Sequence, residues 1–69
     1  MPFIEVTLVE GRSPEQLRAL ISGLTQAASD AVDAPLGNIR VVIREVPPTH
    51  WAAGDVTIAE RMKREEGIE

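Results

Sequence analysis

The sequence contains no cysteine and a single histidine, His50. These absences exclude disulfides and thiolate-bound metals and disfavour a histidine-rich metal site, so we expect no metal ion. They also fit a cytoplasmic location. A chain of 69 residues has a small core, in which ~25 cal/mol per Å² of apolar burial roughly balances ~1.5 kcal/mol of entropy per residue. Self-association is the remaining source of stability.

Long hydrophobic runs and a surplus of basic residues are also missing. The net charge is -4, from 11 acidic and 7 basic residues. Without a basic stripe we do not expect a nucleic-acid partner. No apolar stretch reaches the length of a membrane span, and the N-terminus lacks the basic region of a signal peptide, so no membrane association is expected. At 43% hydrophobic residues, the sequence predicts one folded domain over residues 1–69.

Local patterns predict a strand followed by a helix. Apolar and polar residues alternate over residues 3–9, which is typical of a strand with one apolar face. The helix is predicted to begin with Ser13 as N-cap, Pro14 in its first turn and Gln16 completing a capping box. It continues to about Val32 on an apolar stripe with the helical period. The stripe consists of Leu17, Leu20, Ile21, Leu24, Ala28, Ala31 and Val32.

A second strand is predicted over residues 39–46, where β-branched residues are frequent. A strand, a helix and a strand with short connections form a right-handed β-α-β unit with parallel strands, which makes this an α/β fold. One helix covers only one face of the sheet, whereas parallel sheets are normally covered on both. We therefore expect a partner subunit on the other face, and hence an oligomer.

The C-terminal part carries the only tryptophan, Trp51, in a predicted turn or short hairpin over residues 49–54. Residues 55–58 can form a short third strand. Alternatively, Thr57 and Glu60 cap a short helix that runs to Arg64. Because seven of the last ten residues are charged, we interpret the segment from about residue 60 to 69 as a solvated tail.

Four residues are candidates for a functional site, each with a simpler structural interpretation. Pro2 is an ordinary strand-start proline, but if Met1 is removed it carries a free secondary amine that can act as a base. Arg12 is either a solvated loop arginine or a ligand for a carboxylate. Arg40, inside a strand, either forms a salt bridge, extends to the sheet edge, or binds a carboxylate through its planar fork. Trp51 is either a hydrophobic plug or a pocket wall. No motif around a serine supports a triad with His50.

Several of these residues match the motif of one family. The matching residues are the Met1-Pro2 start, the Leu-x-Glu-Gly-Arg-Ser segment at 8–13, Asp-Ala-Pro-Leu at 33–36, Arg40 before Val-x-Ile, and an aromatic residue after His50 followed by Gly54. With them the sequence resembles the 4-oxalocrotonate tautomerase family over residues 2–57.

This resemblance implies a cofactor-independent isomerase of aromatic catabolism that acts on a small 2-oxo or 2-hydroxy dienoic acid. Pro2 would be the general base, Arg40 would stabilise the enolate oxygen, and Arg12 would hold a substrate carboxylate. Val9 and Trp51, where the family usually has leucine and phenylalanine, would form an apolar wall. The arginines and this wall would lower the pKa of the amine.

The resemblance also implies subunits that pair into a four-stranded sheet, most often as a homohexamer built from three dimers, although a simple dimer is an alternative. One pocket can then draw on more than one subunit. Two functional alternatives remain. One is a non-catalytic assembly or ligand-binding module on the same scaffold, and the other is a dehalogenase or decarboxylase of the same superfamily.

Overall fold

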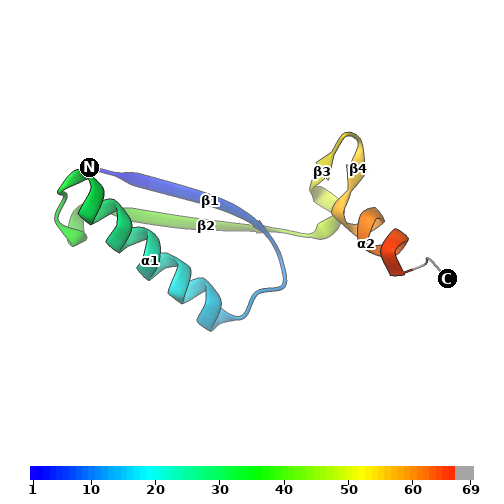
Figure 1. Cartoon of the computed structure of the whole chain (residues 1–69), viewed down its shortest axis with the longest axis horizontal. Helices are drawn as coiled ribbons and strands as arrows, with labels where there is room; N and C mark the ends of the chain where they lie inside the picture. Colours follow the sequence, from blue (N-terminus) through cyan, green and yellow to red (C-terminus); the bar gives the residue numbers. More distant parts are fainter. Residues whose placement is uncertain (67–69) are drawn as a thin grey trace.

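The computed structural model describes residues 1–66 and contains the predicted β-α-β unit. Strands β1 (Phe3–Val9) and β2 (Arg40–Val46) pair in parallel along their whole length. Helix α1 (Pro14–Val32) connects them and lies across one face of the sheet (Figure 1). Strand β2 begins one residue later than predicted. The reason is local: the Ile39 N–H donates to Leu36 O at 3.1 Å and so closes the 3-10 turn η1 (Leu36–Asn38) instead of joining the ladder.

The predicted start of α1 is confirmed. Ser13 Oγ accepts from the Gln16 N–H at 3.1 Å, and Gln16 Oε1 accepts from the Ser13 N–H at 2.9 Å. These two bonds satisfy donors that the first turn of a helix otherwise leaves free. The helix ends at Asp33, whose left-handed backbone (φ 57°) terminates it as predicted just before Pro35.

The residues after β2 form a separate projection, which we call the C-terminal arm (residues 47–66). It contains the 3-10 turn η2 (Pro48–His50), the antiparallel strands β3 (Ala52–Ala53) and β4 (Val56–Thr57), and helix α2 (Ile58–Glu66). Gly54 and Asp55 both have positive φ, at 59° and 66°, which is the geometry of a tight type I′ hairpin.

The arm settles two open points of the sequence analysis. The third strand and the capped helix were alternatives, yet both occur, because Thr57 ends β4 and also caps α2. The solvated-tail interpretation is wrong for residues 60–66, which are helical, although residues 60–65 are exposed as expected. The rest of that tail, residues 67–69, lies outside the described residues.

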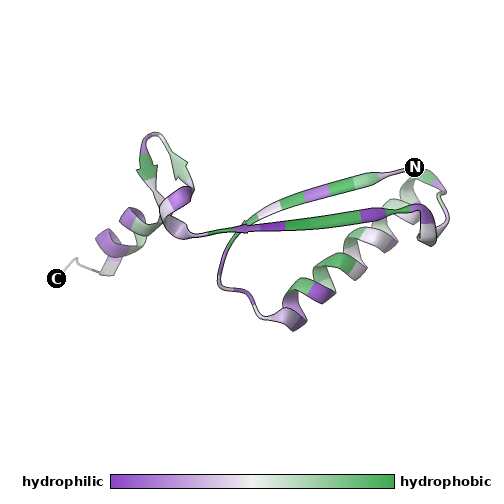
Figure 2. Ribbon diagram, turned by 180° about the vertical axis from the view of Figure 1, so that it is seen from behind, coloured by the Kyte–Doolittle hydropathy of each residue, from purple (hydrophilic) through white to green (hydrophobic). Residues whose placement is uncertain are grey.

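The single chain has almost no core. Among the described residues only Ile39 is buried, at 8% exposure, and the apolar side chains between the sheet and α1 are half-buried. The radius of gyration is 16.1 Å, whereas a compact domain of this length would have about 11 Å. Hydrophobic stretches occur on both strands of the sheet as well as on α1 (Figure 2). On the open face of the sheet, Phe3 and Val42 remain 62% and 41% exposed.

Candidate active site

Pro2 and Arg40 lie together at the amino end of the sheet. The Arg40 N–H donates to the Pro2 carbonyl at 3.0 Å, and Arg40 stands opposite Phe3 in the ladder. Proline has no N–H to contribute to a ladder, so Pro2 is held by its carbonyl while its nitrogen is not needed for pairing. Removal of Met1, which is 82% exposed, would therefore leave this anchor of Pro2 intact.

The Arg40 side chain is oriented by the preceding turn. Its Nη1 donates to Gly37 O at 2.8 Å, within η1. A guanidinium has five N–H donors, so this bond leaves donors for an anion. The salt bridge on the open face joins Glu5 to Arg44. In the part of the chain that the structure describes, Arg40 is thus not the partner of a glutamate, which removes one of its structural interpretations.

Arg12 and Val9 lie at the opposite, carboxyl end of the sheet. Arg12 Nη1 donates to Val9 O at 2.9 Å, and Val9 pairs with Val46 in the ladder. Seven strand residues at ~3.3 Å each place this end about 20 Å from Pro2. Within one chain, Arg12 and Pro2 therefore cannot contact the same small substrate.

Trp51 lies on the C-terminal arm, directly after η2. Its carbonyl accepts from the Ile58 N–H at 2.8 Å, and its side chain is 38% exposed. The five predicted site residues thus occupy three places: Pro2 with Arg40, Val9 with Arg12, and Trp51 on the arm.

Two hollows of the described part of the chain lie away from these places. Two open hollows, of about 460 and 280 Å³, both lie against α1. The larger is lined by Pro14, Glu15, Arg18, Ala19 and Ser22. Neither is lined by Pro2, Arg12 or Arg40. Among residues 1–66 there is also no cluster of three or more histidine, cysteine or acidic residues suited to a metal ion.

One neighbour of the candidate base was missed by the sequence analysis. Phe3 follows Pro2, faces Arg40 across the ladder, and remains largely exposed on the open face. The available signal was the only phenylalanine of the sequence, next to Pro2 and on the side of the predicted strand that faces away from Ile4, Val6 and Leu8. An aromatic ring there adds apolar surface beside the candidate base.

The sequence and the fold are similar to those of known proteins. The family model described as "Tautomerase enzyme" matches residues 2–61. A protein of Ralstonia nicotianae named a probable tautomerase is 52% identical over 56 residues, covering 81% of this chain and 80% of that protein. A 2-hydroxymuconate tautomerase of Comamonas testosteroni is 43% identical over 60 residues, covering 87% and 95%. The solved heterohexamer 4-oxalocrotonate tautomerase of Chloroflexus aurantiacus aligns with a TM-score of 0.85 at 47% identity, covering 87% and 97%.

A β-α-β subunit with this match along nearly its whole length defines an enzyme of the tautomerase class. The chain belongs to the 4-oxalocrotonate tautomerase family, which confirms the resemblance noted in the sequence. No helix among residues 1–66 is long and apolar enough to cross a membrane.

Proposed function

We propose that this protein is a cofactor-independent tautomerase for a small 2-oxo or 2-hydroxy dienoic acid, with the Pro2 amine as general base once Met1 is removed. The observation that carries the proposal is the hydrogen bond at 3.0 Å from the Arg40 N–H to the Pro2 carbonyl, at the start of the paired strands. It puts a candidate base and a candidate oxyanion donor on neighbouring rigid strands. The similarity to a 2-hydroxymuconate tautomerase supports the substrate class and a role in aromatic catabolism.

The chemistry requires a neutral amine. Its lone pair takes a proton next to the substrate carbonyl, or from the enol hydroxyl, and the resulting ammonium returns the proton to another carbon to give the conjugated keto acid. Negative charge develops on the carbonyl oxygen in between, where donors from Arg40 stabilise it. An ordinary α-amino group has a pKa of ~7.7–8.0, and a nearby guanidinium and apolar surface both lower the pKa by disfavouring the ammonium. Both effects raise the fraction of neutral base at physiological pH.

A complete site in this proposal needs a second subunit. Pro2 and Arg12 are about 20 Å apart within one chain. A neighbouring copy that runs in the opposite direction along the sheet brings its carboxyl end, with Val9 and Arg12, beside the amino end of the first copy. The exposed Phe3 and Val42 lie on the open face of the sheet, which further copies would cover in the full assembly. We propose a homohexamer as the full assembly; the heterohexameric relative supports the number of subunits.

The test compares the trimmed protein, which begins at Pro2, with a form that retains Met1. Mass spectrometry verifies each N-terminus, and ultraviolet absorbance follows the ketonisation of 2-hydroxymuconate. We expect turnover only in the trimmed form, with the same sedimentation behaviour in both. Equal rates would show that Pro2 is only a strand-start proline. Hydration of a 3-haloacrylate in place of tautomerisation would favour the dehalogenase alternative.

A further inference from the structure

Helix α2 extends beyond the segment that defines the family. The family model matches residues 2–61, whereas α2 spans Ile58–Glu66. It follows β4 without an intervening residue, so the hairpin and the helix form one continuous unit (Figure 1). A nine-residue helix is marginal in isolation. Its formation must therefore depend on its cap and on its neighbours.

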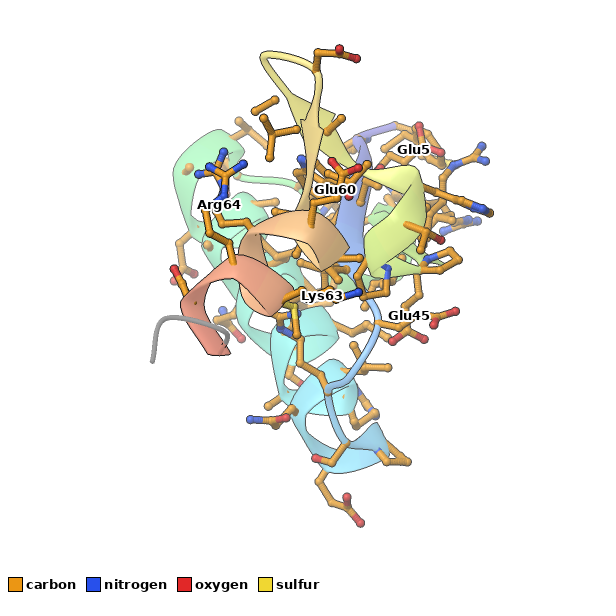
Figure 3. The ribbon with its side chains drawn as sticks, turned by 90° about the vertical axis from the view of Figure 1, so that its right-hand side faces the viewer. Glu5, Glu45, Glu60, Lys63 and Arg64 are labelled. Atoms are coloured by element: carbon orange, nitrogen blue, oxygen red, sulfur yellow. The ribbon has the colours of Figure 1, made fainter. Side chains whose placement is uncertain are left out.

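The cap of α2 is a reciprocal capping box. Thr57 Oγ1 accepts from the Glu60 N–H at 3.0 Å, and Glu60 Oε1 accepts from the Thr57 N–H at 2.9 Å. The Glu60 side chain extends from the first turn of α2 toward the base of the hairpin (Figure 3). Because Thr57 is also paired with Ala52 in the hairpin, this box joins α2 to the strand that follows Trp51.

Trp51 is bound directly to the start of the same helix. The N–H of Ile58, the first residue of α2, donates to the Trp51 carbonyl at 2.8 Å. This N–H is one of the donors that a helix start leaves unsatisfied. Helix α2 also packs against η2, the turn that immediately precedes Trp51. Helix α2 is thus connected to the turn η2 that precedes Trp51 and to the strand β3 that follows it, so the position of Trp51 depends on α2.

We propose that α2, held by the Thr57–Glu60 box, is a positioning element that fixes Trp51 as a wall of the substrate pocket. This inference rests on the proposed function, in which Trp51 contacts substrate. Thr57 and Glu60 are positioning residues, since they act through the Trp51 backbone and not on the reacting atoms. Weakening the box lowers the fraction of molecules in which Trp51 is in place, and the apparent affinity for substrate falls by the same factor.

The experiment uses the full trimmed protein with Thr57→Ala and Glu60→Ala. Thr57→Ser and Glu60→Gln keep the capping groups and serve as rescue variants. Glu65→Ala, an exposed change on the same helix, is the matched control. Two readouts are combined: kcat and KM for 2-hydroxymuconate, and the fluorescence of Trp51, which is the only tryptophan in the chain.

For the two alanine variants we expect KM to rise by no more than about fivefold, which is the change in an equilibrium constant that the loss of a helix cap usually causes. We expect kcat to be nearly unchanged. Trp51 emission shifts to longer wavelength and is quenched more readily by acrylamide. The rescue variants and Glu65→Ala behave as wild type. Together these results would support the positioning role.

Three results would overturn the inference. Unchanged fluorescence and kinetics in Thr57→Ala would show that the box does not hold Trp51. A fluorescence change with an unchanged KM would show that Trp51 does not contact substrate, while leaving the Pro2 chemistry intact. A wild-type protein without turnover would instead contradict the proposed function, and the inference would fall with it.

Discussion

The two candidate arginines differ in what holds their side chains. Arg40 is tied to the carbonyl of Gly37 beside Pro2, and Arg12 is tied to the carbonyl of Val9 at the far end of the sheet. Each bond limits the side-chain freedom that a flexible arginine would lose on binding an anion. The proposed roles, oxyanion stabilisation for Arg40 and carboxylate binding for Arg12, are those that the family resemblance implies.

Arg40→Ala and Arg12→Ala should therefore affect different kinetic parameters. An interaction made only in the transition state appears in kcat, and one made equally with bound substrate appears in KM. We expect Arg40→Ala to lower kcat by roughly 10²–10³, as for the loss of an oxyanion-hole donor. Arg12→Ala should mainly raise KM. Steady-state kinetics on 2-hydroxymuconate measures both.

The matched control for these variants is Arg18→Ala on the exposed side of α1. Arg18 donates to Ser22 of its own helix at 2.9 Å, and it lines two hollows that neither Pro2 nor Arg40 lines. Its replacement should leave both parameters close to wild type. Kinetics near wild type in Arg40→Ala would remove that residue from the mechanism.

Pro2 is expected to set the pH dependence. A neutral amine is the active form, so the rate should rise with pH through the pKa of the amine and level off above it. With neighbours that disfavour the ammonium, this midpoint should lie below the ordinary α-amino value of ~7.7–8.0. Pro2→Ala keeps a primary amine and should retain reduced activity. A rate that does not change between about pH 5 and 9 would contradict an amine base.

At the scale of elements, the first turn of α1 sets where the connection after β1 becomes helical. Ser13→Ala removes the hydroxyl that accepts from Gln16 and should destabilise the protein by about 1 kcal/mol. Denaturant unfolding at one fixed protein concentration measures the loss, because stability of an oligomer depends on concentration.

Ser22→Ala provides the comparison for this cap. Ser22 lies on an exposed turn inside α1, where alanine is the better helix former. It should leave stability unchanged or slightly raised. An equal loss in both variants would mean that the Ser13 cap contributes nothing beyond an ordinary helix position.

At the scale of the whole molecule, the open face of the sheet and the small number of buried residues indicate that the chain is stabilised by association with other subunits. A parallel sheet that is covered on one face only, in a chain of 69 residues, is not expected to be stable alone. We predict that the protein is an oligomer, a hexamer, at micromolar concentration. Sedimentation velocity measures this state. Val42→Asp, which puts an unpaired charge on the open face, should break the assembly and the activity together. Val42→Thr should preserve both the assembly and the activity. A stable folded monomer of the unsubstituted protein would contradict the prediction.

Subunit mixing tests whether sites are shared. A form that retains Met1 has a blocked Pro2 but an intact Arg12, whereas the trimmed Arg12→Ala variant has the reverse. If each site takes Pro2 and Arg12 from different subunits, random mixing after unfolding and refolding should rebuild about a quarter of the sites. Activity no higher than the sum of the two separate forms would show that both residues come from one chain.

The sequence by itself determined the elements and the family. The alternation over β1, the box at Ser13 and the stripe of α1 are local signals, read within a few residues, and each predicted its element. The motif around Pro2, Arg12 and Arg40 identified the family. The start of α2 was also indicated by a local pattern, the possible cap formed by Thr57 and Glu60. The many charged residues after it led to the interpretation as a solvated tail.

Only the tertiary structure decided how the site residues are distributed. The parallel register places Arg40 beside Pro2, although 37 positions separate them in the chain, and it places Arg12 at the other end of the same sheet. The sequence predicted that the strands are parallel, but not their register, which depends on residues far apart in the chain. The turn at Ile39 depends on a single hydrogen bond to Leu36. The bond that ties Trp51 to α2 was not predicted either, because it exists only once the hairpin between them has closed.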